Sequence, residues 1–354
     1  MFATIRLWRL AWTTMALFSA LLTSVALAAP PHEDLSFTVG LPRVNGSVSI
    51  HADVFNNPQN RGALTILAVH GFTERASMFG PLADAIFADN VLGRAVKRII
   101  SLDMPAHGDS GVPSLPSPLK YQDLLIDDNV SVVIQSIDIL RGLGKGAQII
   151  MGHSMGGLEI QAAQEALLAQ NSSLARHGIF GAILISAVPA RGTQWTQPPP
   201  SPGQAQFVVN DPVLGVILDL PAALGPLTGG FTTLAGTIVP NAPSQATFIA
   251  NDWVAPEPIT TTLQLTGTTA PLWRPFVRQN AFALRNGTLL SVLSFSQDVL
   301  TPAVDQPILY TYLTGLSASG LTLYRPIVAS DAVHSMFISN PTGLLGALKN
   351  GVIR

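Results

Sequence analysis

The sequence predicts an α/β fold with a mostly parallel β-sheet. Short apolar runs rich in β-branched residues alternate along the chain with longer stretches of helical character. The later apolar runs contain almost no polar residues, which is typical of strands that helices cover on both faces. The alternation of the two patterns therefore predicts consecutive βαβ units.

The strands and helices follow from these patterns in chain order. Two early runs, 36–42 and 47–55, alternate apolar and polar residues, which suits a half-exposed antiparallel pair. Six further strands are expected at 63–69, 97–103, 147–152, 179–188, 289–295 and 321–329. Helices are expected near 76–88, 121–142, 155–169, 303–317 and 341–350. The prediction is therefore an eight-stranded, mostly parallel sheet flanked by helices.

Composition excludes several classes of function. The chain has 354 residues, no cysteine, a formal net charge of −2 and only 11% charged residues. A near-neutral chain lacks the clustered Lys and Arg that a nucleic-acid partner requires. Without cysteine there is no disulfide framework, thiolate nucleophile or thiolate zinc site. The length allows one large domain, with or without an insertion.

The N-terminal residues predict a signal peptide. Arg6 and Arg9 precede an uncharged apolar run that ends in Ala26-Leu27-Ala28, so residues 1–28 combine a basic segment, an apolar segment and a small-residue cleavage site. We expect a secreted or periplasmic mature protein. The alternative is an uncleaved membrane anchor, because the run approaches the ~20 residues that span a bilayer. No second run of that length follows, so no membrane span is expected after cleavage.

Residues 193–283 interrupt the alternation of strands and helices. The segment begins with a proline-rich run and contains only six charged side chains, at 211, 219, 252, 257, 274 and 278. It is too long for a structureless loop, so we expect a cap subdomain inserted into a core formed by 29–192 and 284–354. Its low charge predicts packing over an apolar surface, either a substrate pocket or the body of the domain.

A nucleophilic serine is indicated at the middle of the chain. Gly152-His153-Ser154-Met155-Gly156 lies directly after an apolar run and directly before a helical stretch. This is the G-x-S-x-G pattern in the strand–turn–helix context of a nucleophile elbow. The glycines leave room for a sharp turn that exposes the serine hydroxyl. Ser154 is therefore the candidate nucleophile.

The serine needs a base, and the base needs an acid to orient it. Among seven histidines, His334 stands just after the last predicted strand, at the edge of a parallel sheet where reactive residues collect. Asp298 is the first carboxylate after strand 289–295, which makes it the preferred acid. Asp305 is the alternative, although its place near a helix start suits a solvated acid. The three residues follow one another along the chain in the order Ser, Asp, His, which is the order of triads whose serine lies on a nucleophile elbow.

Backbone N–H groups are expected to stabilise the oxyanion of the reaction. The amides of Phe72 and Met155 are the predicted donors, because His70-Gly71-Phe72 ends the strand next to the elbow. Gly71 allows a tight turn, and His70 is expected to stabilise that loop. His153 is expected to point away from the attack position, and with His70 and Gly71 it is assigned to the surroundings of the substrate pocket.

These motifs resemble those of α/β-hydrolase fold serine hydrolases, in the esterase and lipase-like branch that carries a cap. The resemblance covers about 36–350 and rests on HGF at 70–72, D-x-P-x-H-G-x-S at 103–110, GHSMG at 152–156, Asp298 and His334. It implies that His107 belongs to a structural loop near the pocket and that the cap lies between the sixth and seventh strands. Ala106 departs from the usual glycine. Serine at the elbow differs from the aspartate of haloalkane dehalogenases and epoxide hydrolases.

The expected function is hydrolysis of an ester with an apolar acyl or alcohol part, on a small-molecule or polymeric substrate. No metal or organic cofactor is implied. A lactonase, thioesterase, amidase, perhydrolase or transferase could use the same triad, because the fold hosts many chemistries. A hydrolase scaffold retained for ligand binding is the alternative outside enzymes, and an intact Ser–His–acid set argues against it.

Overall fold

The computed structural model describes residues 32–59, 61–71, 74–105, 107–119, 126–187, 289–295, 322–327 and 336–352. Several predictions of the preceding section fall outside these residues. They are the signal peptide, the cap at 193–283, the helix near 303–317, and the site residues Phe72, Asp298 and His334.

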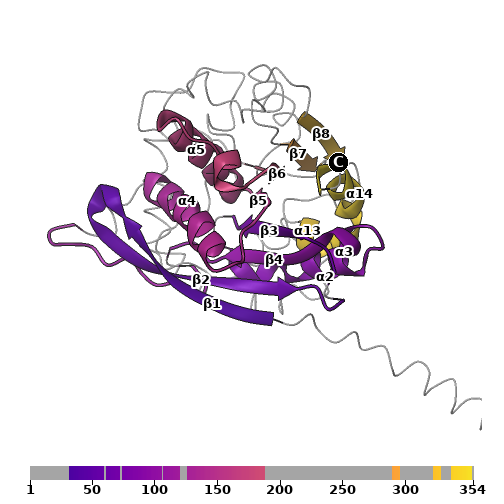
Figure 1. Cartoon of the computed structure of the whole chain (residues 1–354), viewed down its shortest axis with the longest axis horizontal. Helices are drawn as coiled ribbons and strands as arrows, with labels where there is room; N and C mark the ends of the chain where they lie inside the picture. Colours follow the sequence, from indigo (N-terminus) through magenta and orange to yellow (C-terminus); the bar gives the residue numbers. More distant parts are fainter. Residues whose placement is uncertain are drawn as a thin grey trace, which may run out of the picture. The chain divides into compact units, whose positions relative to one another are not determined.

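An eight-stranded sheet organises the described residues, in the order β1-β2-β4-β3-β5-β6-β7-β8 (Figure 1). The strands β1 and β2 pair antiparallel, as do β2 and β4, and every other pair is parallel. The mostly parallel eight-stranded sheet is therefore confirmed. Its strands are β1 (His32–Leu41), β2 (Gly46–Asn56), β3 (Leu64–Val69), β4 (Val96–Leu102), β5 (Ile149–His153), β6 (Gly181–Ile185), β7 (Leu289–Phe295) and β8 (Thr322–Ile327).

Helices pack against both faces of the sheet. Those described are α2 (Gly80–Ala88), α3 (Leu92–Ala95), α4 (Ile126–Gly142), α5 (Met155–Ala169), α13 (Met336–Ser339) and α14 (Pro341–Val352), with short 3₁₀ segments η1 (Pro42–Val44), η2 (Ala76–Phe79) and η4 (Leu174–His177). One buried cluster joins the sheet to α2, α3, α13 and α14, and a second joins it to α4 and α5. The helices of the two clusters are labelled in Figure 1.

The alternation of strand side chains explains these two cores. In β3, Ile66 and Ala68 belong to the first cluster, whereas Leu67 and Val69 belong to the second. Successive side chains of a strand point to opposite faces, so an apolar run without polar breaks is buried on both sides. The same reasoning accounts for the apolar sequences of β5 and β6.

The structure departs from the predicted element boundaries in a few places. Strand β1 begins at His32, four residues before the predicted start at 36. The added residues include His32, Glu33 and Asp34, which are polar but still pair with β2. The helix predicted at 76–88 divides into η2 and α2, and Pro81 stands in the first turn of α2. Proline suits that position, since the first N–H groups of a helix have no intrahelical acceptor.

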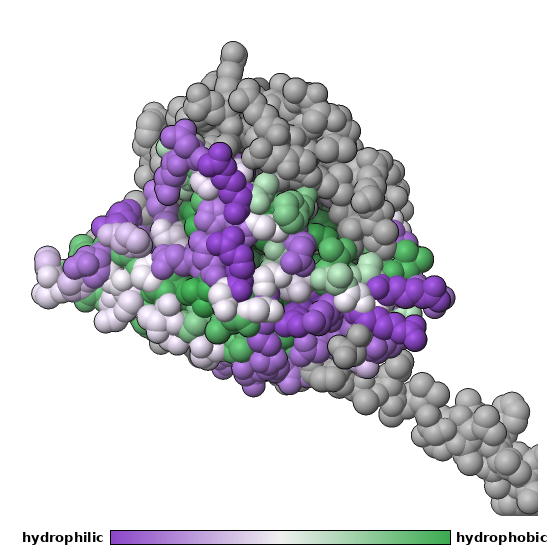
Figure 2. Space-filling model, in the orientation of Figure 1, coloured by the Kyte–Doolittle hydropathy of each residue, from purple (hydrophilic) through white to green (hydrophobic). Residues whose placement is uncertain are grey.

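The surface is mixed in character. Figure 2 shows hydrophilic and apolar residues interspersed on the face that it presents. The large apolar residues exposed among the described ones, Val91, Val112, Leu143 and Phe180, stand apart in the sequence, as single exposed apolar residues commonly do. Within the described ranges, no helix combines the length and hydropathy needed to cross a bilayer.

Candidate active site

Ser154 occupies a strained turn between β5 and α5. Its φ is +50°, in the left-handed region that a non-glycine residue rarely adopts. The Ser154 N–H donates to the Ile185 carbonyl at 3.0 Å, and the Ser154 carbonyl accepts from the Gly157 N–H at 3.1 Å. These bonds to β6 and to the first turn of α5 hold the turn in place. The strand–turn–helix context predicted for the serine is therefore present, and backbone strain of this kind often occurs at functional sites.

Close packing explains why glycines flank the serine. A Cβ on Gly152 would lie 2.5 Å from Ile160 Cδ1 and 2.6 Å from the Gly156 carbonyl oxygen. A Cβ on Gly156 would overlap the carbonyl oxygens of Val69 and His70. Because neither position has room for a side chain, the turn can approach β3 and start α5 at once.

The first N–H groups of α5 lie beside the serine. Met155 is the first residue of α5, and the first N–H groups of a helix have no intrahelical acceptor. The helix dipole adds positive potential at this end. The loop after β3 also reaches the serine, because a Cβ on Gly71 would be 3.0 Å from Ser154 Cβ. The structure thus brings Ser154, Met155 and Gly71 together, while the second predicted donor, Phe72, lies outside the described residues.

A buried carboxylate, Glu74, connects this loop to the elbow. The Gly71 N–H donates to Glu74 Oε2 at 2.6 Å, and His153 Nδ1 lies 2.8 Å from the same oxygen. The Glu74 N–H donates back to the Gly71 carbonyl at 3.3 Å. Glu74 therefore bonds both to the residue before the predicted donor Phe72 and to the residue before Ser154. Sequence reasoning missed it, although an acid three residues after the glycine of an HG pair was an available signal.

His153 and His70, both assigned to the pocket surroundings, are completely buried in the structure. The His153 ring packs against Phe337 with centroids 4.7 Å apart. His70 Nε2 accepts from the Met104 N–H at 3.0 Å, and its Nδ1 lies 2.6 Å from the Gly71 carbonyl oxygen. Burial lowers the pKa of His70, so its ring is neutral and connects two loops. This agrees with the loop-stabilising role expected of His70.

Asp103 organises the loop formed by the D-x-P-x-H-G-x-S motif. Its carboxylate accepts the N–H groups of Ala76 at 2.6 Å and Asp109 at 2.9 Å, and lies 2.9 Å from His51 Nδ1. Burial opposes ionisation, but the hydrogen bonds, led by that of His51, hold the pKa of Asp103 below its usual range. Gly108 has a φ of +51°, and a side chain there would overlap the Asp103 carboxylate.

His107 lies in the same loop, fully buried, and its Nδ1 is 3.0 Å from the Pro105 carbonyl oxygen. Burial and the neighbouring His70 lower the pKa of His107 to about 3. The ring centroids of the two histidines are 5.0 Å apart. A histidine that stays neutral at physiological pH and bonds to its own loop is suited to a structural role.

Two described elements lie next to the predicted acid and base in the sequence. Strand β7 ends at Phe295, three residues before Asp298, and α13 begins at Met336, two residues after His334. Phe337 of α13 contacts the ring of His153, the residue before Ser154. Asp298 and His334 themselves stay predictions.

Comparison with known proteins identifies the family. The sequence profile described as "Alpha/beta hydrolase family" matches residues 66–344. Among solved structures, an esterase from Exiguobacterium antarcticum has 17% identity and a TM-score of 0.59, over 90% of this chain and 100% of its own. A bromoperoxidase from Bacillus anthracis has 16% identity and a TM-score of 0.59, over 89% and 98%. An enol-lactonase from Burkholderia xenovorans LB400 has 15% identity and a TM-score of 0.53, over 85% and 97%.

No curated protein sequence gives a significant match. The structural neighbours are too distant in sequence to indicate more than a common fold. The family profile, however, covers most of the chain, begins within β3 and includes strands β4 to β8. The eight-stranded sheet and the turn at Ser154 agree with it. The chain belongs to the alpha/beta hydrolase family.

Proposed function

We propose that this protein is a secreted serine hydrolase that cleaves carboxylic esters with an apolar acyl or alcohol part. The observation that carries the proposal is the strained turn at Ser154, with a φ of +50° directly before the first residue of α5. A serine held in this way, next to the free N–H groups of a helix start, can attack a carbonyl carbon whose oxygen those groups stabilise.

The proposed reaction has two stages. Ser154 Oγ attacks the ester carbonyl while His334 accepts its proton, and Asp298 keeps the His334 ring in the required tautomer. The amides of Phe72 and Met155 stabilise the oxyanion, and His334 then protonates the departing alkoxide. In the second stage water, deprotonated by His334, attacks the acyl-enzyme and releases the acid and Ser154.

Two features of the described residues support acyl transfer. The loop before Phe72 is fixed by Glu74 and lies against Ser154 at Gly71, which is where an oxyanion donor is needed. Serine rather than aspartate at the elbow suits an acyl-enzyme intermediate. The esterase and the lactonase among the structural neighbours have names that agree with this class of chemistry.

The decisive experiment combines turnover with covalent labelling. We expect the purified protein to hydrolyse p-nitrophenyl esters and to be labelled once by a serine-directed phosphonate, whereas Ser154→Ala loses both properties and keeps its circular dichroism spectrum. Ser186→Ala is a matched control, because Ser186 also follows a strand and has a positive φ of 43° but is completely buried. Labelling of Ser154→Ala at another serine would refute the assignment.

Secretion is part of the proposal and has its own test. If residues 1–28 are a cleaved signal peptide, the protein recovered from outside the cytoplasm begins at Ala29 when its N-terminus is sequenced. Recovery of the intact N-terminus in the membrane fraction would instead support the anchor alternative.

A further inference from the structure

Two short H-x-D motifs meet on one face of the β1–β2 pair. His32-Glu33-Asp34 begins β1, and His51-Ala52-Asp53 lies within β2. Asp34 and Asp53 are direct cross-strand partners, while His32 pairs with Phe55 and His51 with Ser36. Residues two apart in a strand point to the same face. The four polar side chains therefore share a face, with one histidine on either side of the aspartate pair.

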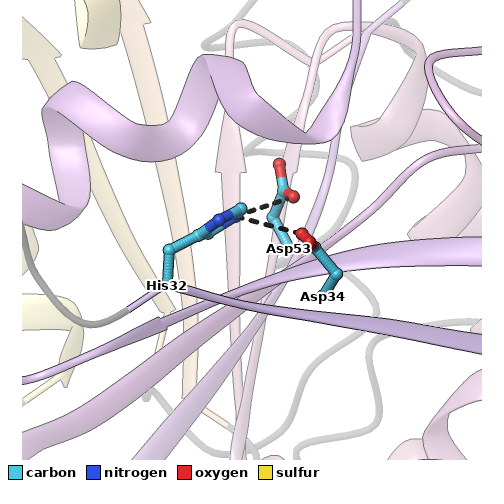
Figure 3. A group of neighbouring side chains, drawn as sticks. All are labelled: His32, Asp34 and Asp53. Atoms are coloured by element: carbon cyan, nitrogen blue, oxygen red, sulfur yellow. Dashed lines mark hydrogen bonds and ion pairs between the residues drawn. The ribbon is translucent and has the colours of Figure 1, made fainter.

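The ligand atoms of His32, Asp34 and Asp53 all lie within 4.8 Å of one another, and His51 approaches the two aspartates. His32 Nε2 lies 2.9 Å from Asp53 Oδ1 and 3.6 Å from Asp34 Oδ1. Figure 3 shows the three side chains, with both contacts drawn as dashed lines. His51 Nε2 lies 3.6 Å from Asp34 Oδ1 and 3.8 Å from Asp53 Oδ1. Ligands about 2.0–2.1 Å from a tetrahedral Zn²⁺ are separated from one another by ~3.4 Å, so these spacings are close to the edges of such a tetrahedron.

The surroundings of His51 favour a cation at this position. Its Nδ1 is hydrogen-bonded to Asp103 Oδ2 at 2.9 Å, and this carboxylate is fully buried. Because Nδ1 is bonded to Asp103, Nε2 is the ring nitrogen that lies near the two aspartate oxygens. A histidine fixed in this way by a carboxylate is the arrangement commonly found behind metal ligands.

The facing carboxylates of Asp34 and Asp53 also favour a cation at this position. Two carboxylates that face each other across an antiparallel pair repel unless a positive charge lies between them. Within the described part of the chain, the ion pairs of Asp34 and Asp53 involve histidines only. Asp53 is buried, whereas His32 and Asp34 are exposed, so the cluster has one fixed ligand and an open side through which an ion can enter.

We propose that His32 Nε2, Asp34 Oδ1 and Asp53 Oδ1 bind a divalent transition-metal ion, with Zn²⁺ as the best match, and that His51 Nε2 supplies the fourth ligand. Mixed imidazole and carboxylate donors at these spacings suit Zn²⁺ better than Ca²⁺ or Mg²⁺, which prefer oxygen ligands in larger number. The sequence alone predicts no metal, because the two motifs become neighbours only through the pairing of β1 with β2.

The position in the fold indicates what such an ion would do. Among the described strands, β1 lies at the edge of the sheet and pairs with β2 alone. His32 is its first residue, so a shared ion would fix the start of the edge strand to its neighbour. Metal ligands from two strands contribute to folding stability, because the unfolded chain does not hold them together.

Isothermal titration calorimetry of the tag-free purified protein, after treatment with EDTA and dialysis, tests the site. We expect one Zn²⁺ per chain, a rise in Tm on saturation that EDTA reverses, and Co²⁺ absorption of the intensity typical of tetrahedral coordination. His32→Ala, Asp34→Asn and Asp53→Asn should each abolish or strongly weaken binding. His32 and Asp34 are exposed, so their variants test the site even if the Asp53 variant fails to fold.

Two matched controls locate the ion. Glu33→Gln removes a carboxylate from the opposite face of β1, where it pairs with Lys145 at 2.9 Å, and should bind Zn²⁺ like the wild type. Asp109→Asn alters the neighbouring group of His51, Asp103 and Asp109, and should also bind normally. The absence of stoichiometric Zn²⁺ binding by the wild-type protein would overturn the proposal. So would unchanged binding by the His32 and Asp34 variants.

Discussion

Glu74 is a buried side chain that bonds to two separate segments of the candidate active site. Its carboxylate accepts the Gly71 N–H and lies within hydrogen-bond distance of His153 Nδ1, so it couples the loop after β3 to the turn that carries Ser154. The donors of an oxyanion hole act only if they are held in place before the reaction begins. Glu74 is therefore a positioning residue for the proposed chemistry.

Glu74→Gln should lower kcat more than it raises KM. The amide keeps the size of the side chain but has one oxygen instead of two, so the loop is held less firmly. A displacement of about 1 Å can cost up to about 10²-fold in rate. Steady-state kinetics on a p-nitrophenyl ester measures the change, and the Glu33→Gln variant, in β1, is the control. An unchanged kcat in a folded Glu74→Gln protein would show that the loop does not need this bond.

The acid of the triad can be assigned by comparing two neighbouring aspartates. Asp298→Asn should reduce kcat by a factor on the order of 10⁴, because an asparagine favours the wrong tautomer of His334. Asp305→Asn should have little effect, since the sequence predicts a solvated position for Asp305 near a helix start. Rates of both variants on the same ester decide the matter, and a reversed result would move the assignment to Asp305.

At the scale of a single element, helix α5 begins directly after Ser154 and contains a buried acid, Glu159, in its second turn. Glu159 is completely buried, and its Oε1 accepts from Asn129 Nδ2 of α4 at 2.8 Å. Burial raises the pKa of Glu159 from 4.5 to about 8, although the bond from Asn129 acts in the opposite direction. The carboxyl group is therefore protonated in the folded protein near neutral pH.

This shift predicts a loss of stability as pH rises. The unfolded chain releases the Glu159 proton near pH 4.5, whereas the folded chain keeps it until about pH 8. The contribution of Glu159 to the free energy of unfolding is complete below pH 4.5 and is lost as pH rises through 8, with a slope of at most about 1.4 kcal/mol per pH unit.

Urea denaturation between pH 5 and pH 9 measures the effect, with Glu159→Gln as the test variant. Glutamine carries no charge at any pH, so the variant should show a flatter dependence of unfolding free energy on pH than the wild type. Glu33→Gln, at a partly exposed position, should keep the wild-type slope. If the wild type and Glu159→Gln had parallel curves, Glu159 would ionise at its ordinary pKa.

Across the whole molecule, the sequence predicted regular elements better than contacts between them. All eight strands were predicted, because apolar runs and two-residue alternation are local signals. The short helices α3 and α13 were missed, since four residues are too few to show a helical period. The division of 76–88 into η2 and α2 was missed as well, because both segments have the same apolar character.

In the candidate site, too, local features could be predicted from the sequence and long-range contacts could not. Gly152, Ser154 and Gly156 form a contiguous motif, so their turn could be predicted from the sequence, and its context is confirmed. The bonds of Glu74 to Gly71 and His153 join separate segments, and only the pairing of β3 with β5 brings those segments together. Long-range contacts of this kind depend on topology, which composition and periodicity do not specify.

At the scale of the whole chain, we predict that substrate preference depends on the cap expected at 193–283, which follows β6 in the sequence. Residues 193–283 lie outside the described residues and carry six charged side chains. If part of this segment lines the acyl pocket, longer acyl chains should react faster. Each buried methylene is worth about 0.8 kcal/mol, so two more carbons should raise kcat/KM roughly tenfold until the pocket is full.

A series of p-nitrophenyl esters from acetyl to octanoyl measures this dependence. The series should be run below the critical micelle concentration of each ester, so that the response reflects the enzyme pocket and not aggregation of the substrate. Ser154→Ala supplies the background rate for every chain length. A flat response would mean that the apolar residues of 193–283 pack against the core without contacting the acyl chain, because an apolar pocket must distinguish substrates by the surface that they bury.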